Sequence, residues 1–161
     1  MKQTSASQPP ADIDLRSQPG HNIRRLQQIA FAVFMKEAAS AGTTPVQYAV
    51  LQTLSDQPGI DQRTLARAVS LDTSTIGGVV DRLEARALLV RSLSPQDRRV
   101  RLLHLTDAGE ALRRELLPTM LQAQQRMLDP LSAAERQCFM DMVQRVIAHR
   151  AGVDDSTTPE G

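Results

Sequence analysis

The sequence predicts a mainly α-helical protein that carries one small β hairpin. Apolar residues recur at helical spacing through most of the chain, and two short apolar runs lie close together between residues 88 and 105. A turn that ends in paired arginines joins these runs, and a helix with small hydroxyl residues in its first turn comes directly before them. This order is typical of a winged helix-turn-helix, and the terminal helices are left over to form a dimerisation region.

The first two helices are bounded by recognisable stop and start signals. An apolar stripe predicts a helix from about residue 21 to 41, which Gly42 ends. Thr44 then caps a second helix with Pro45 at its first position, and Pro58-Gly59 ends it.

The middle of the chain predicts a compact helix-turn-helix followed by a hairpin. Asp61 caps a third helix, Leu71 forms the turn, and Asp72 caps a fourth helix that runs to about Ala87. Two strands follow at residues 88–90 and 100–105, with the hairpin turn at residues 94–98.

Two long helices complete the chain. Thr106 caps a fifth helix to about Asp129, which Pro118 is expected to kink or split because proline lacks the backbone N–H. Ser132 and Glu135 form a capping box that opens the last helix.

These elements predict four kinds of region. Residues 1–20 and 151–161 are expected to be flexible tails, because they are rich in small and polar residues. Residues 45–105 form the winged helix-turn-helix, and residues 21–44 and 106–150 form a helical dimerisation region. The outer helices carry more apolar surface than one small winged unit can cover, so we expect a homodimer with interleaved terminal helices.

Composition narrows the class of protein. The net charge is only +1, but six arginines lie between residues 82 and 101, which favours a local contact with phosphates. Aromatic residues make up 2%, too few for a surface that stacks single-stranded bases. The lone cysteine, Cys138, and the lack of a long apolar run or signal peptide favour a cytoplasmic protein without membrane contact. Cys138 itself is expected to be a buried packing residue.

Catalysis and metal binding are not expected. The sequence has no nucleophile–base constellation and no phosphate-binding glycine loop. His21, His104 and His149 are isolated, with no cysteine or carboxylate at ligand spacing. We therefore predict neither an enzyme, nor a metal site, nor a bound cofactor.

Two short segments are the candidates for contact with duplex DNA. Thr73, Ser74 and Thr75 occupy the first turn of the fourth helix, where short hydroxyl side chains let a helix approach base edges. Asp97, Arg98 and Arg99 form the hairpin tip, where an arginine can enter a narrow minor groove and Asp97 can pair with Arg99. The alternatives are a hydroxyl-rich helix start and a solvated charged turn.

A glycine pair lies inside the same helix. Gly77 and Gly78 each cost a helix about 1 kcal/mol relative to alanine. Close approach to DNA or to a neighbouring helix would compensate, and the sequence does not decide between them.

The span DRLEARALLVRSLSPQDRRVRLLHLTDAGEAL closely resembles the signature of the MarR family of bacterial transcription regulators. The matching positions are an aspartate and an arginine in the wing, then a Leu-Thr pair and a glycine: Asp97, Arg99, Leu105, Thr106 and Gly109. The resemblance implies a dimer that binds a palindromic operator and usually represses, and whose DNA affinity is lowered by a small ligand, often an aromatic acid. Ala87 departs from the family's usual glycine before the wing, and Gly77-Gly78 replace bulkier residues.

The resemblance also places an effector site where the first two helices meet the recognition unit. Arg24 lies on the apolar arc of the first helix, between Phe31 and Met35, and an arginine on an apolar arc needs an anionic partner. A ligand carboxylate would serve, with the ring against Phe31, Met35 and Tyr48 and with His21 as a further donor. The alternative is that Arg24 pairs with a carboxylate of a second chain or extends into water.

The function that the sequence predicts is that of a repressor released by a small aromatic carboxylate. An activator or a regulator without a small ligand uses the same fold. A winged helix that serves only protein contacts is the remaining alternative, and it would lack the steep salt dependence of duplex binding.

Overall fold

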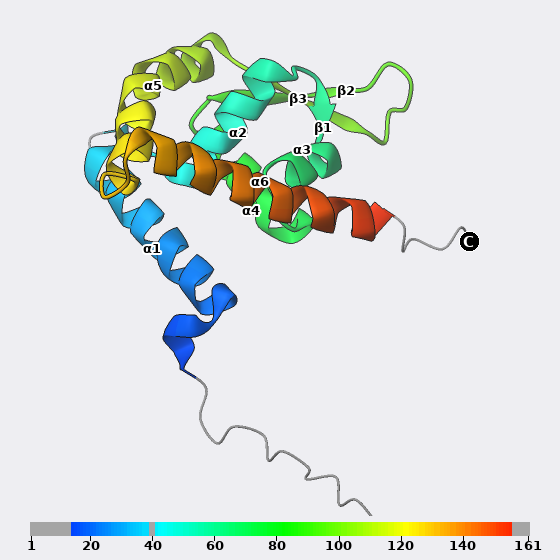
Figure 1. Ribbon diagram of the computed structural model, residues 1–161. Coiled ribbons are helices and arrows are strands. Elements are labelled where there is room, and N and C mark those ends of the chain that lie inside the picture. Colours follow the sequence, from blue (N-terminus) through cyan, green and yellow to red (C-terminus); the bar gives the residue numbers. More distant parts are fainter. Residues whose placement is uncertain (1–13, 39–40, 156–161) are drawn as a thin grey trace, which may run out of the picture.

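The computed structural model describes residues 14–38 and 41–155. Its elements follow the predicted order, as Figure 1 shows. They are a 3₁₀ turn η1 (Leu15–Ser17), then α1 (Pro19–Glu37), α2 (Pro45–Asp56), β1 (Ile60–Asp61), α3 (Gln62–Ala68), α4 (Thr73–Ala85), β2 (Leu89–Leu93), β3 (Arg101–Leu105), α5 (Asp107–Met127) and α6 (Ala133–Asp155).

The winged unit consists of α2, α3, α4 and a three-stranded antiparallel sheet in the order β1-β3-β2. The hairpin pairs Leu89 with Leu105 and Leu93 with Arg101. Strand β1 was not predicted, since two residues are too few to show a pattern; it forms because Ile60 lies opposite Leu103.

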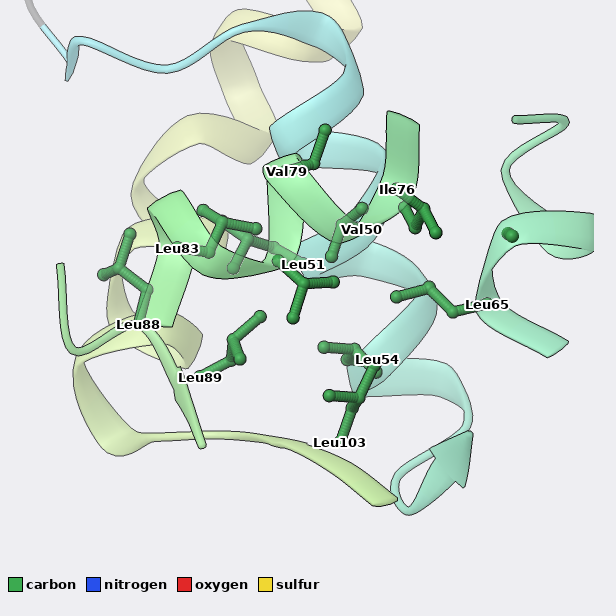
Figure 2. Packing of buried hydrophobic residues seen from close by; sticks show 12 residues of the cluster. Val50, Leu51, Leu54, Leu65, Ile76, Val79, Leu83, Leu88, Leu89 and Leu103 are labelled. Atoms are coloured by element: carbon green, nitrogen blue, oxygen red, sulfur yellow. The ribbon is translucent and has the colours of Figure 1, made fainter. Parts of the chain in front are cut away.

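One apolar core holds this unit together, and Figure 2 shows its side chains meeting from three helices and the hairpin. Burying one such leucine or isoleucine side chain contributes about 1.5–3 kcal/mol relative to leaving it exposed. The fully enclosed members with the largest side chains are Leu51, Leu54, Leu65, Ile76, Leu83, Leu89 and Leu103.

The predicted caps of the winged unit are confirmed. The Thr44 hydroxyl accepts from the Gln47 N–H at 3.2 Å, and the Gln47 side chain accepts from the Thr44 N–H at 3.0 Å. Asp61 caps α3 and Asp72 caps α4, each through two backbone N–H groups. These side chains satisfy donors that the first turn of each helix leaves free.

Helix α4 ends in a left-handed turn at Ala87. The φ of Ala87 is +55°, and the N–H groups of Ala87 and Leu88 donate to Glu84 and Leu83. This pattern is the Schellman motif, which glycine usually occupies. The departure from the family's glycine therefore leaves the turn intact and places an alanine in a costly conformation.

The start of α5 is pressed against this same turn. The Thr106 hydroxyl donates to the Ala87 carbonyl at 2.7 Å and accepts from the Gly109 N–H at 3.0 Å. A Cβ at Gly109 would lie 1.9 Å from the Leu88 carbonyl oxygen. Only glycine allows this approach, which explains the Leu-Thr and Gly positions of the motif.

Three predictions about the terminal helices need correction. Pro118 was expected to kink or split α5, and the split is wrong, because α5 is continuous from Asp107 to Met127. The residues from Asp14 to Gly20 were expected in a flexible tail, but the Asp14 carboxylate caps η1 and α1 begins at Pro19. At the other end α6 reaches Asp155, so the first five residues of the predicted C-terminal tail, 151–155, are helical. Residues 1–13 and 156–161, also predicted as tails, lie outside the described residues.

The helical ends leave much apolar surface uncovered. Helix α1 packs along α5, and Figure 1 shows α1 in blue and α6 in orange diverging from the corner where α5 ends. Cys138 on α6 is exposed, so the expectation of a buried cysteine is wrong for the single chain. The exposed apolar residues of these helices are Ile23, Ile29, Phe31, Met35, Leu117, Leu121, Met140, Met142, Val146 and Ile147.

Candidate DNA-binding surface and ligand pocket

The first turn of α4 presents a hydroxyl cluster to solvent. Thr73, Ser74 and Thr75 are all exposed, whereas Ile76 is fully buried and anchors the helix in the core. The turn before it is a second Schellman motif, in which Ser70 has a φ of +56°. The helix-turn-helix therefore holds the three predicted contact residues together at its surface.

Two of these hydroxyl groups are oriented by Asp72. The Ser74 hydroxyl donates to Asp72 Oδ1 at 2.5 Å, and the Thr75 hydroxyl donates to Asp72 Oδ2 at 2.6 Å. These two bonds hold the pKa of Asp72 far below its usual range, so the carboxylate stays ionised. With their protons engaged, the two oxygens face outward only as hydrogen-bond acceptors.

The wing tip is held by hydrogen bonds between residues close in the sequence. The Ser94 hydroxyl, buried beneath the turn, accepts from the Gln96 N–H at 3.3 Å and the Asp97 N–H at 3.4 Å. The Asp97 carboxylate accepts from the Arg99 N–H at 2.9 Å, and the Asp97 carbonyl accepts from the Val100 N–H at 2.9 Å. Sequence reasoning missed Ser94, whose only signal was a serine at the start of the turn.

Asp97 therefore bonds the main chain of Arg99, whereas an ion pair with its side chain was expected. An aspartate two residues before an amide in a turn is well placed for this local bond. The guanidinium groups of Arg98 and Arg99 are left exposed at the tip. Both arginines are exposed on a hydrogen-bonded turn, which suits a contact with phosphates.

A cavity of about 500 Å³ lies between α1, α2 and α5. Arg24 and Phe31, two of the predicted ligand-binding residues, both line it. Arg24 is exposed and forms no ion pair with any residue that the structure describes. Among the described lining residues none is acidic, and the remaining walls are Gln27, Gln28, Ala30, Phe34, Pro45, Val46, Met120 and Gln124.

The other three predicted ligand residues do not line this cavity. Met35 faces outward on α1, and His21 lies half-buried near the start of that helix. Tyr48 is buried in a second apolar cluster with Phe34 and Leu116. Phe34, which sequence reasoning did not select, lines the cavity.

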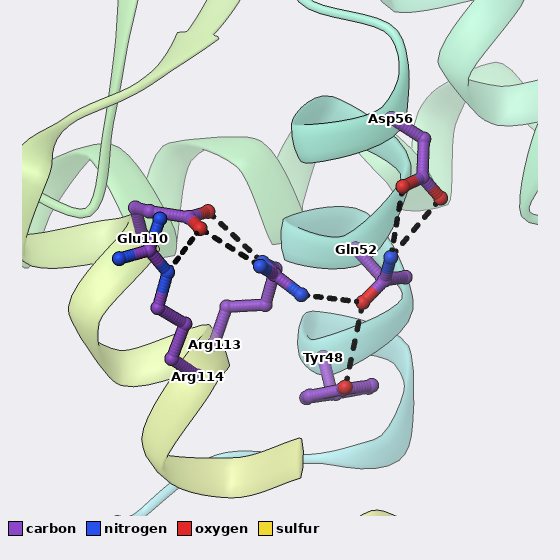
Figure 3. A network of polar contacts seen from close by, with 6 residues as sticks. All are labelled: Tyr48, Gln52, Asp56, Glu110, Arg113 and Arg114. Carbon is purple, nitrogen blue, oxygen red and sulfur yellow. Dashed lines mark hydrogen bonds and ion pairs between the residues drawn. The ribbon is translucent and has the colours of Figure 1, made fainter.

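Tyr48 belongs instead to a polar network that joins α2 to α5 (Figure 3). Its hydroxyl donates to Gln52 Oε1 at 3.4 Å, and Arg113 donates to the same oxygen at 3.0 Å. Arg113 also binds Glu110 through two nitrogens, and this bond lowers the pKa of Glu110 to about 2. Burial raises the pKa of Tyr48, so the phenol keeps its proton.

A second groove, of about 600 Å³, lies between α1, α5 and α6. It is almost entirely apolar and continues the uncovered faces of these helices. Its lining includes Ile23, Leu26, Met127, Phe139, Met142, Val143, Val146 and Ile147.

The fold and these surfaces define a winged helix-turn-helix regulator with an exposed recognition helix, an arginine-tipped wing and a separate cavity. Comparison with known proteins gives the family. The family model of MarR matches residues 43–100. The transcriptional repressor NicR of Pseudomonas putida is 33% identical over 149 residues, which cover 91% of this chain and 94% of NicR. The chain belongs to the MarR family and is a transcriptional regulator of that type.

Solved structures agree with this assignment. The PcaV regulator of Streptomyces coelicolor, in complex with its natural ligand, is 44% identical, covers 86% of this chain and 98% of its own, and has a TM-score of 0.78. BpsR of Bordetella bronchiseptica, whose DNA binding is regulated by 6-hydroxynicotinic acid, is 33% identical, with coverages of 84% and 97% and a TM-score of 0.80. No helix among the described residues is long and apolar enough to cross a membrane.

Proposed function

We propose that this protein is a homodimeric repressor that binds a palindromic duplex operator and is released by a small aromatic carboxylate. The observation that carries the DNA-binding part is the exposed hydroxyl turn of α4 in the same packed unit as an exposed, ordered arginine tip. A recognition helix and a wing in one rigid unit can engage a major groove and the adjoining backbone together.

The dimer is proposed from the uncovered apolar faces of α1, α5 and α6. A continuous exposed apolar patch of this extent favours a second copy of the chain as its cover. In such a dimer the two recognition helices must sit about 34 Å apart to reach successive major grooves on one face of a duplex.

DNA binding is tested by selecting duplexes from a random library with the full-length protein. We expect a palindromic consensus, and an affinity for the selected duplex that falls steeply with salt because arginines displace counterions from phosphates. A chain that enriches no duplex, or binds with no salt dependence, would contradict the proposal. A promoter–reporter pair carrying the selected site then separates repression from activation.

The hydroxyl cluster has a more specific role in this proposal. Ser74 and Thr75 present acceptors, and the donors in the major groove are the amino groups of adenine N6 and cytosine N4. We therefore expect adenine or cytosine at the two positions that these residues read. Phosphate oxygens are acceptors and cannot pair with them.

This base preference is tested by removing single amino groups from the selected duplex. Replacing the contacted adenine by purine, or cytosine by 2-pyrimidinone, should weaken binding by roughly fivefold, about 1 kcal/mol for one neutral hydrogen bond. In Ser74→Ala the same replacement at the Ser74 position should change nothing. If Ser74→Ala loses affinity equally on all duplexes, the residue contacts only the backbone.

The ligand site is proposed at the cavity that Arg24 and Phe31 share. An unpaired guanidinium can hold a carboxylate, the phenylalanines can stack on a ring, and the glutamine amides can bond ring substituents. The ligand lowers DNA affinity only by binding a misaligned dimer more tightly, typically with 1–3 kcal/mol of coupling.

Arg24→Ala tests this site against a neighbouring control, Arg25→Ala, which removes the same charge outside the cavity lining. The probes are 6-hydroxynicotinic acid and a series of hydroxybenzoic acids, read by thermal shift and by release of the selected duplex. We expect Arg24→Ala to bind DNA normally and to resist release by the active probe, while Arg25→Ala responds as the unaltered protein does. Release of Arg24→Ala at the usual probe concentration would reject the site.

A further inference from the structure

The hairpin of the wing is joined to the recognition helix by one arginine that the DNA-contact residues do not include. Arg91 lies on β2, two residues after the buried Leu89 and therefore on the same face of the strand. Its side chain is only 22% exposed. The strand's next residue on that face, Leu93, is exposed, so Arg91 is the last inward-facing contact before the wing leaves the core.

Arg91 binds two carboxylates of α4 at once. Its Nη2 lies 2.5 Å from Asp81 Oδ1, and its Nη1 pairs with Glu84 Oε2. Asp81 and Glu84 are three residues apart and so lie on one side of the helix. The planar fork of a guanidinium can reach both acceptors in a fixed orientation, which the single ammonium of a lysine cannot do.

The position of Asp81 connects this clamp to DNA recognition. Asp81 lies seven residues after Ser74, on the same stripe of α4, and its side chain is 69% exposed. Gly77 and Gly78, between them, add no side chain to that stripe. An unpaired carboxylate there would repel the phosphates of a duplex in the groove, and Arg91 compensates its charge from the wing side.

We propose that Arg91 is a positioning residue for DNA binding, which fixes the wing relative to the recognition helix so that both engage the duplex together. This inference rests on the proposed DNA-binding function. Ion pairs that remain partly exposed contribute little to folding stability. Without Arg91, we therefore expect the chain to fold as before. The wing should then lose its fixed position relative to the recognition helix.

A double-mutant cycle between Arg91 and the wing tip tests the proposal. The probe is the duplex selected by the unaltered protein, and affinity is measured by fluorescence anisotropy. We expect Arg98→Ala to weaken binding roughly tenfold or more in the unaltered chain. In an Arg91→Met background the same change should cost less than about threefold, because the tip is no longer held at the duplex. An equal loss in both backgrounds would overturn the clamp.

A variant that neutralises all three members of the clamp separates geometry from electrostatics. Combining Asp81→Asn, Glu84→Gln and Arg91→Met removes two negative charges and one positive charge, so the chain becomes more positive by one. If Arg91 acts only by compensating charge, this variant binds the duplex as tightly as the unaltered chain or more tightly. The clamp predicts weaker binding together with the reduced cost of Arg98→Ala. Arg91→Lys, which keeps the charge without the fork, should also bind more weakly.

A failure of the clamp can be distinguished from a failure of the proposed DNA-binding function. Without DNA binding no duplex is selected at all, before any variant is compared. Thermal unfolding and sedimentation of each variant check that fold and oligomeric state are unchanged, and the triple variant carries the test if Arg91→Met proves unstable.

Discussion

The winged unit and the terminal helices differ in how far one chain buries their apolar side chains. In the winged unit Leu51, Leu89 and Leu103 are fully enclosed by residues of one chain. On α6, by contrast, Val146 is 62% exposed and Ile147 is 56% exposed, although both are as apolar as the core leucines. The winged unit thus completes its own core, whereas the helical ends are expected to complete theirs with a second chain. The predictions below test this contrast, from the largest expected effect to the smallest.

Charges placed on the uncovered face of α6 should separate the proposed dimer. Val146→Glu with Ile147→Glu would bury two unpaired carboxylates at the interface, which costs roughly 4 kcal/mol and raises the dimer Kd about a thousandfold. Sedimentation at micromolar concentration should then give a monomer whose winged unit remains folded. Gln144→Glu, one charge on a polar position of the same helix, should leave the dimer intact. If the variant with both charges still forms a dimer, the uncovered face of α6 is not the dimer interface, and the contrast between the winged unit and the terminal helices is wrong.

A cavity in the core of the winged unit should affect folding more than assembly. Leu51→Ala removes a fully enclosed side chain and should lower the free energy of unfolding by about 2–5 kcal/mol. Leu121→Ala on α5, where the side chain is 57% exposed, should cost less than about 1 kcal/mol in the monomer made above. Denaturant unfolding of both variants in that background checks the difference, and equal costs would show that the helical end is packed within one chain.

Substitutions at the wing tip should change DNA affinity and leave stability and dimer unchanged. Arg98→Ala should weaken binding to the selected duplex by about 1–3 kcal/mol. Asp97→Ala should weaken it less, because it removes the acceptor of the Arg99 N–H that orders the turn. Simple electrostatics predicts the opposite sign for Asp97→Ala, so tighter binding by that variant would refute the role of the turn. Arg114→Ala on α5 serves as the control for loss of one surface arginine.

The smallest effect is expected at the end of α4. Ala87→Gly should stabilise the winged unit by about 0.5–1 kcal/mol, because glycine adopts the positive φ of this turn without the cost of a Cβ. Ala85→Gly, at the last residue of α4, should instead destabilise the unit by less than about 1 kcal/mol, because there glycine only adds backbone freedom to a helical position. Thermal melts of the two variants should therefore shift in opposite directions, and a common direction would show that the left-handed turn carries no strain.

Local signals predicted the elements that depend on neighbouring residues. Thr44, Asp61, Asp72 and Thr106 were identified as caps because a capping side chain bonds an amide only two or three residues away. The hairpin was predicted for the same reason, since its strands are joined by a short turn. Strand β1 was missed, because two residues become a strand only through pairing with β3.

The site residues that the sequence did not identify depend on contacts between elements that are far apart in the chain. Arg91 meets Asp81 and Glu84 across elements, and Phe34 rather than Tyr48 lines the cavity. Ser94 lies beneath a turn that its own N–H closes by donating to the Val100 carbonyl. Pro118 shows the converse, because α5 continues through a proline that the local rule expected to kink or split it.

The sequence by itself determined the winged helix-turn-helix, its hydroxyl turn and its arginine tip, because periodicity, caps and turns are set by interactions within a few residues. Only the tertiary structure decided which side chains line the cavity, which carboxylates Arg91 joins, and which apolar faces the single chain leaves uncovered. Those outcomes depend on how whole elements pack against one another, and packing is governed by the shape and burial of residues that are far apart in the chain.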